Sequence, residues 1–72
     1  MNERFEAAAR LYESAAEELA QAAAHCLTAA GHFRNQVVPR GTAHAWAALG
    51  HIRTAEQSLD AQAQRHARHS EP

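Results

Sequence analysis

Apolar residues recur every seven positions over the first half of the chain, which is typical of a helix that packs along one stripe. If Phe5 takes heptad position a, large residues repeat at that position as far as Phe33, with alanine pairs at d and e between them. The side chain of Asn2 can accept a hydrogen bond from the first turn, so it is a suitable N-cap. The pattern therefore predicts one long helix over residues 3–35, with its a, d and e positions facing a neighbour.

The stripe is interrupted near the middle of the chain. Pro39 disfavours helix at the residue before it, and Gly41 permits a turn, so a connection is expected at residues 36–41. Thr42 can then cap a second helix over residues 42–67. The last residues, 68–72, are expected to fray. Together these elements predict one all-α domain, residues 1–72, folded as an antiparallel two-helix hairpin.

An eleven-residue phrase occurs twice, as AHCLTAAGHFR at residues 24–34 and AHAWAALGHIR at residues 43–53. The histidines in its two slots are His25, His32, His44 and His51. All of them fall at position g, and an antiparallel hairpin brings g positions of the two helices face to face. A register that pairs His32 with His44 also sets His25 opposite His51. Folding would therefore turn the repeat into a symmetric arrangement.

The composition suggests that one hairpin is not enough. Apolar residues make up 46% of the chain, but most of them are alanine, and Cys26 is the only cysteine, so no disulfide can form within the chain. Small scaffolds usually need a disulfide, a metal or a second subunit. Residues 20–30 are apolar or small on nearly every face, which predicts a second copy and a four-helix bundle. The residues expected at that interface are Leu27, Gly31, Phe33, Trp46, Leu49, Gly50 and Ile52.

The histidines are also candidate ligands. Residues seven apart on one helix are separated by about 10.5 Å, so a site would need groups from both helices and from a second hairpin. No carboxylate lies between Leu19 and Ala55, which leaves imidazole nitrogens, with the Cys26 thiol, and favours zinc, nickel or copper. Two other interpretations stay open: the histidines form hydrogen bonds across an interface, and Cys26 is a small apolar core residue. Paired imidazoles would also make assembly sensitive to protonation.

A weaker candidate is the turn end, where Arg34, Arg40 and Arg53 could attract an anion or an acidic partner; the alternative is a solvated turn. The net charge of -1 gives no reason to expect nucleic acid, and no apolar run reaches the length of a membrane span. No catalytic motif is present, and the acidic beginning is unlike a signal peptide. We expect a non-enzymatic cytoplasmic protein that binds itself and another protein; the alternative is a small metal- or ligand-binding bundle.

Overall fold

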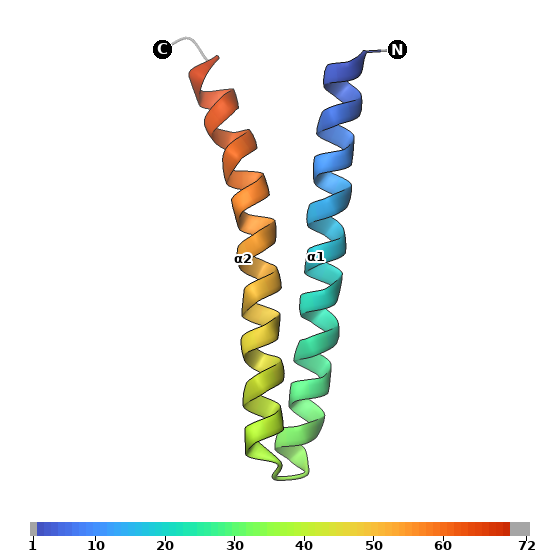
Figure 1. Ribbon diagram of the computed structural model, residues 1–72, viewed down its shortest axis with the longest axis vertical. Helices are drawn as coiled ribbons and strands as arrows, with labels where there is room; N and C mark the ends of the chain where they lie inside the picture. The colour runs from blue at the N-terminus through green and yellow to red at the C-terminus, as the bar shows by residue number, and fades with distance from the viewer. Residues whose placement is uncertain (1, 70–72) are drawn as a thin grey trace.

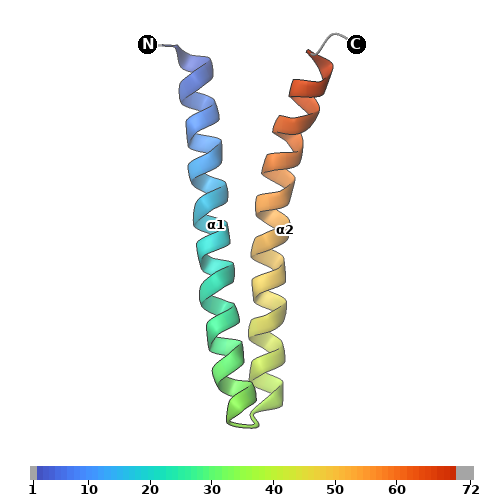
Figure 2. The ribbon, with the colours of Figure 1, turned by 180° about the vertical axis from the view of Figure 1, so that it is seen from behind.

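The computed structural model describes residues 2–69, and over that range the chain forms two long helices. Helix α1 (Glu3–Arg34) and helix α2 (Val38–Arg68) run antiparallel along each other, and the chain enters and leaves at the same end of the hairpin (Figure 1). The view from behind shows the same simple pair (Figure 2). The hairpin measures 52 × 29 × 12 Å, so it is long and thin. The predicted all-α hairpin is confirmed, and its pairing into a four-helix bundle stays a prediction.

The start of α1 follows the sequence prediction. The backbone of Asn2 is extended, and its side-chain oxygen accepts a 2.9 Å hydrogen bond from the backbone N–H of Arg4. This bond satisfies one of the N–H groups that have no partner within the first turn. Glu3 and Glu6 lie in the same turn, where the helix dipole favours negative charge. The N-cap at Asn2 is therefore confirmed.

The connection between the helices is shorter than predicted. Gln36 takes a left-handed conformation with φ of 62°, and the backbone N–H of Val37 donates a 2.8 Å bond to the carbonyl oxygen of His32. Helix α2 then begins at Val38 with Pro39 in its first turn. Proline is tolerated there because the N–H it lacks would have no helical partner. Residues 36 and 37 of the predicted turn do lie in the connection, but residues 38–41 belong to α2, so the predicted extent of the turn and the cap at Thr42 are wrong.

The C-terminal end of α2 lies within one residue of the prediction. The helix was expected to end at about residue 67 and ends at Arg68, and the backbone N–H of His69 donates a 3.1 Å bond to the carbonyl oxygen of His66. Arg68, the first residue of the stretch 68–72 that was expected to fray, is therefore helical. Arg65 and Arg68 lie in the last turn, where cations interact favourably with the helix dipole. Residues 70–72 lie outside the described residues.

Small residues form the contact between the helices. Among residues 2–69, the buried apolar side chains are Ala15, Ala22, Ala29, Ala48 and Ala55. The three in α1 occupy heptad position d, and those in α2 continue a seven-residue row that starts at the buried Gly41. We call these two facing rows, one in α1 and one in α2, the alanine seam. Such small side chains let two helix axes approach to the low end of the usual range, about 8 Å.

Most of the large residues at position a do not enter this contact, which corrects the prediction that they face the neighbouring helix; the exception is Phe33, which packs on Gly41. The side chain of Phe5 is 71% exposed, and Tyr12 and Leu19 are also exposed. Cys26, predicted to face the core, is exposed as well. The physical reason is spacing: helices held together by alanine leave no room between them for a phenyl ring or a leucine side chain. The large side chains are therefore displaced to the flank of the seam.

The displaced side chains of both helices gather on the same flank. One groove is lined by Leu19 together with Ile52 and Leu59, and the next groove by Tyr12 together with Leu59, so residues of α1 and α2 border common hollows. We call this surface the apolar face. Its large exposed members are Phe5, Tyr12, Leu19, Phe33, Val38, Leu49, Ile52 and Leu59. On a heptad helix position d lies between a and g, so the g positions line the other flank of the seam.

Close packing at the turn explains one glycine. Gly41 is buried inside the first turns of α2, and a Cβ placed on it would lie 2.8 Å from the ring of Phe33. That distance is shorter than carbon atoms tolerate, so the phenyl ring occupies the space that any other side chain would need. Gly41 therefore serves helix packing, whereas the sequence pattern had been interpreted as a turn.

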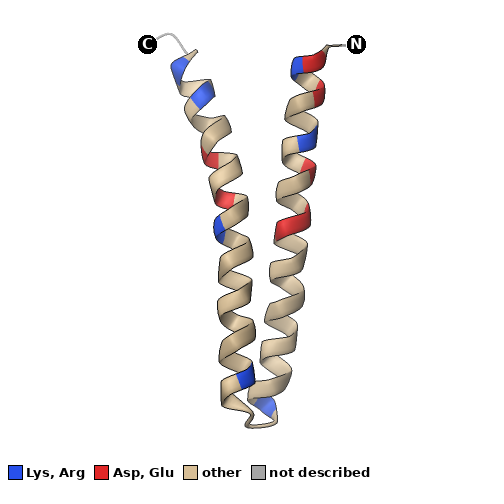
Figure 3. Cartoon of the chain, in the orientation of Figure 1, with Lys and Arg blue, Asp and Glu red and all other residues tan. Residues whose placement is uncertain are grey.

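Charge is distributed unevenly along the hairpin. Among the described residues, Figure 3 shows the carboxylates in the half that carries the termini, whereas the turn half carries only arginine among its fully charged residues. In the described part of the chain, neither helix contains a stretch long and apolar enough to cross a membrane.

Candidate functional site

The four repeated histidines lie together along the seam, on the flank away from the apolar face. The rings of His25 and His51 stack with centroids 5.4 Å apart and planes inclined by 13°. The rings of His32 and His44 stack in the same way at 5.5 Å and 19°. These are the two cross-helix pairs that the repeated phrase predicts, so the register of the hairpin is confirmed.

A third contact joins the two pairs into one line. The Nδ1 atoms of His25 and His44 lie 3.0 Å apart, within hydrogen-bond distance, and their ring centroids are 5.2 Å apart. The imidazoles therefore follow one another along the seam in the order His32, His44, His25, His51. We call this line the histidine ladder. Sequence reasoning missed the middle contact because it considered only residues directly opposite, whereas each g residue lies between two g residues of the other helix.

The ladder ends at a carboxylate that the sequence analysis did not select. Oε2 of Glu18 lies 2.6 Å from Nδ1 of His51, and both side chains are about 30% exposed (30% and 29%). Glu18 lies seven residues before His25 and so occupies the same heptad position. That position could have identified it, because the row of g residues in α1 continues through Glu18 just before the stretch without carboxylates.

The two polar contacts place different demands on protons. A hydrogen bond between the Nδ1 atoms of His25 and His44 needs one nitrogen to donate and the other to accept, so only one of the two can carry a proton. The contact between His51 and Glu18 is strongest when the imidazole is positively charged and donates to an ionised carboxylate. Protonation therefore strengthens the contact of His51 with Glu18, but it breaks the hydrogen bond between His25 and His44 once both rings are charged.

The five candidate metal ligands are not brought to one point. Cys26 is exposed at position a, which lies across the seam from the histidines. Within residues 2–69, no group of three or more histidine, cysteine, aspartate or glutamate side chains is arranged to hold a metal ion. We therefore assign no metal ligand within this chain, and binding by an assembly of copies stays a prediction.

The residues predicted at the interface fall on three different surfaces. Phe33, Leu49 and Ile52 are exposed on the apolar face, as an interface requires. Leu27 and Trp46 are also exposed, at 77% and 67%, but they lie at heptad position b, which is further from the seam and next to the e positions of the apolar face.

The two repeated glycines lie on a third surface, at position f. Apart from the adjoining residues and the backbone of the same helix turn, no atom lies within 4 Å of a Cβ placed on Gly31 or Gly50, so packing of α1 on α2 does not account for either glycine. Tyr12, Leu19 and Leu59 also belong to the apolar face, although they were not among the predicted interface residues. The signal for them was present in the same seven-residue stripe that indicated the helix.

The three candidate arginines do not converge. Arg34 ends α1 and Arg40 lies in the first turn of α2, so both are at the turn end of the hairpin (Figure 3). Arg53 lies thirteen residues further along α2, which is about 20 Å along the helix axis. Arg34 also lies in the last turn of α1, where a cation is favoured by the helix dipole without any ligand.

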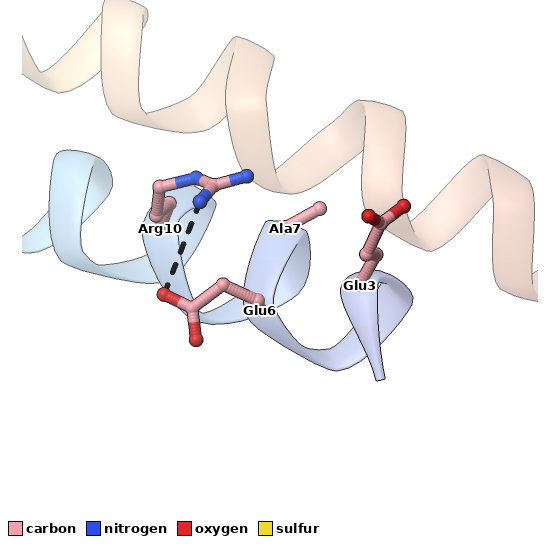
Figure 4. A pocket seen from close by; sticks show the side chains of 4 residues that line it. All are labelled: Glu3, Glu6, Ala7 and Arg10. Atoms are coloured by element: carbon pink, nitrogen blue, oxygen red, sulfur yellow. Dashed lines mark ion pairs between the residues drawn. The ribbon is translucent and has the colours of Figure 1, made fainter. Parts of the chain in front are cut away.

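A surface hollow near the chain start carries little chemistry. It is lined by Glu3, Glu6, Ala7 and Arg10, all from the first turns of α1 (Figure 4). Arg10 and Glu6 form an ion pair of 3.9 Å, and both side chains are largely exposed. An exposed pair one helical turn apart contributes a few tenths of a kcal/mol, roughly 0.3–0.5 kcal/mol. The hollow is therefore an ordinary solvated helix surface.

No protein family model matches the chain, and no curated protein or solved structure was found to match it either.

Proposed function

We propose that two copies of the chain pack through their apolar faces into a four-helix bundle, and that this dimer acts as a non-enzymatic interaction module. The observation that carries the proposal is the concentration of large exposed apolar side chains on one flank of the hairpin. Their exposed area is on the order of 700–900 Å², close to the roughly 800 Å² that each partner buries in a standard interface. Surfaces of this size and chemistry usually mark an interaction site.

The thin core supports the same proposal. The interior of the described hairpin contains alanine side chains and no fully buried large side chain. Removal of apolar area from water contributes about 25 cal/mol per Å², so alanines alone give little stability to helices of this length. Covering the apolar face would bury phenylalanine, leucine and isoleucine side chains that the hairpin leaves in water. Dimerisation would thus supply the stability that a disulfide or a metal supplies in other small folds.

A second copy is the occupant that best fits the surface. The apolar face runs along the hairpin from Phe5 to Leu59 and repeats every seven residues, so an identical face matches it in length and period. At its a and e positions between residues 5 and 63, Glu56 is the one charged residue. Alanines fill every e position of α1 over that range, which lets another helix approach closely. These features favour a two-fold arrangement, in which the same residues are buried on both sides.

The assembled bundle would leave other surfaces for a different protein. Leu27 and Trp46 lie at position b, beyond the e positions that border the apolar face, so part of each side chain would stay in water at the rim of a dimer. An exposed tryptophan is a frequent anchor in protein interfaces. We infer that the dimer presents these outer side chains to a larger protein partner in the cytoplasm.

The sharpest test uses Cys26 as a natural reporter, since it is exposed at position a on the flank that a second copy would cover. Thiol reactivity is measured across a range of protein concentrations, together with the mass from sedimentation equilibrium. We expect reactivity to fall as the dimer forms. A control protein carries Cys26→Ala and Ala43→Cys, which moves the thiol to an outward position, and its reactivity should not depend on concentration.

A matched pair of variants tests the face itself. Ile52→Asp places a carboxylate on the apolar face, and Thr54→Asp places one in the same turn on the other flank. We expect Ile52→Asp to shift the dimer to monomer, with loss of helix, and Thr54→Asp to leave the dimer intact. A folded monomer whose thiol reacts equally fast at every concentration would refute the proposal.

A further inference from the structure

We propose that the histidine ladder makes the pairing of α1 with α2 depend on protonation, so that the hairpin is tight at neutral pH and loosens in weak acid. This inference goes beyond the proposed dimer and does not depend on it, because the ladder lies across the seam from the apolar face. It concerns the contact within one chain, which exists whatever covers the other flank.

The central contact can hold only one proton. The Nδ1 atoms of His25 and His44 face each other at 3.0 Å, one on each helix. When either imidazole is neutral, one nitrogen can donate and the other can accept. When both rings are charged, both Nδ1 atoms carry hydrogen, and the bond is replaced by repulsion between two donors. Charging this pair therefore converts an attraction between the helices into a force that separates them.

The surroundings offer little compensation. The titratable groups that face one another across this part of the seam are Glu18, His25, His32, His44 and His51. Glu18 is the single carboxylate, and its contact with His51 offsets one positive charge at most. Arg40 lies one turn before His44 on the same helix and adds a permanent positive charge. Full protonation would therefore place four imidazolium ions against one carboxylate.

The sign of the pH effect follows from proton counting. Charging both imidazoles of the pair formed by His25 and His44 removes a hydrogen bond that joins the folded helices, whereas the unfolded chain has no such bond to lose. Acid therefore weakens the folded hairpin relative to the unfolded chain, and stability rises with pH. The contact of Glu18 with a charged His51 acts in the opposite direction, but it involves one imidazole of the four. With ring centroids 5.2–5.5 Å apart, repulsion should raise the unfolding equilibrium constant on the order of tenfold or more.

The experiment compares unfolding by urea at pH 7.5 and pH 5.5, followed by helical circular dichroism. The test variant is His25→Gln with His44→Gln, because glutamine can donate and accept hydrogen bonds but takes up no proton. His69→Gln is the control, since that histidine lies at the end of α2, outside the ladder. We expect the unfolding constant of the natural chain and of the control to rise about tenfold in acid, and that of the test variant by less than about threefold.

Two outcomes would overturn the inference: equal stability of the natural chain at both pH values, or an undiminished acid effect in the test variant. Nitrogen NMR of the natural chain gives a second measurement that does not depend on a variant folding. At pH 7.5 it should show one protonated and one unprotonated Nδ1 in the pair formed by His25 and His44. Two Nδ1 atoms in the same protonation state would contradict the proposal. Sedimentation at both pH values measures dimerisation directly, so a failure of the dimer proposal can be distinguished from a failure of this inference.

Discussion

Replacing one alanine of the seam by leucine tests the central physical argument about the hairpin. Ala48 is 3% exposed and lies in the row that holds α1 against α2. Leucine adds three carbon atoms, whose burial alone would be worth roughly 2 kcal/mol at about 0.8 kcal/mol per methylene group. The seam has no space for them, so the helices must move apart and lose contacts along the whole row. Overpacking of this kind costs typically about 1–3 kcal/mol net.

The matched control is Ala43→Leu, which makes the same change on an exposed turn of the same helix. Thermal unfolding followed by circular dichroism should show a lower midpoint temperature for Ala48→Leu than for the natural chain. The expected difference is about 4–8 °C for each kcal/mol lost in a protein of this size. Ala43→Leu should stay within about 0.5 kcal/mol of the natural chain. If Ala48→Leu proved as stable as its control, the helices would not be held at alanine spacing, and the placement of the large side chains on the flank would lose its explanation.

Three further changes test separate features of the hairpin. Gly50→Ala should raise the free energy of unfolding by about 0.5–1 kcal/mol, because alanine is the better helix former and no atom lies within 4 Å of the new Cβ; a lower midpoint in urea would instead reveal another surface packed on this glycine. Glu18→Gln should lower stability at pH 7 by up to about 1 kcal/mol, since the half-exposed contact with His51 loses its charge, and added salt should reduce the difference. Phe33→Ala should cost about 1.5–2.5 kcal/mol in urea unfolding, half the value for a fully buried ring, because the half-exposed ring covers Gly41; no loss would contradict that packing.

The sequence was sufficient for the hairpin and its register but insufficient for the face that each helix turns inward. The seven-residue period is the same for a seam at positions a and d as for one at d and g. Hydrophobicity favoured the first choice, because it puts Tyr12 and Leu19 inside. The alanines decided the outcome through distance: once they set the spacing of the helices, the imidazoles lie on one flank of the seam and the large apolar side chains on the other.

The turn shows a second limit of sequence reasoning. Pro39 and Gly41 are common in turns, and both were interpreted that way, yet both lie inside α2. The first turn of a helix tolerates proline, and a glycine inside a helix also leaves room for another side chain to pack on the backbone. The second reason depends on the position of Phe33, which is close to Gly41 only after folding. The left-handed residue of the connection is Gln36, a residue type with no special preference for that conformation.

The candidate site was predicted in part. The repeated phrase predicted both stacked histidine pairs, because a single register of the two helices sets the members of both pairs opposite each other. It did not give the bond between His25 and His44, which depends on the offset between neighbouring turns. Glu18 was missed because it belongs to a run of glutamates that indicates a solvated surface, and only its heptad position connects it to the histidines. Cys26 was placed in the core by the same assumption that misplaced Tyr12 and Leu19.

The strict period of the alanine seam has a consequence for shape. An undistorted α-helix drifts by about 20° for every seven residues, so small residues repeated at intervals of seven stay in contact only if the helices wind around each other with a left-handed twist. Two identical chains have the same handedness and the same pitch. Their outer contours can therefore follow one another over many turns, whereas straight rods that cross at an angle would touch at a single point.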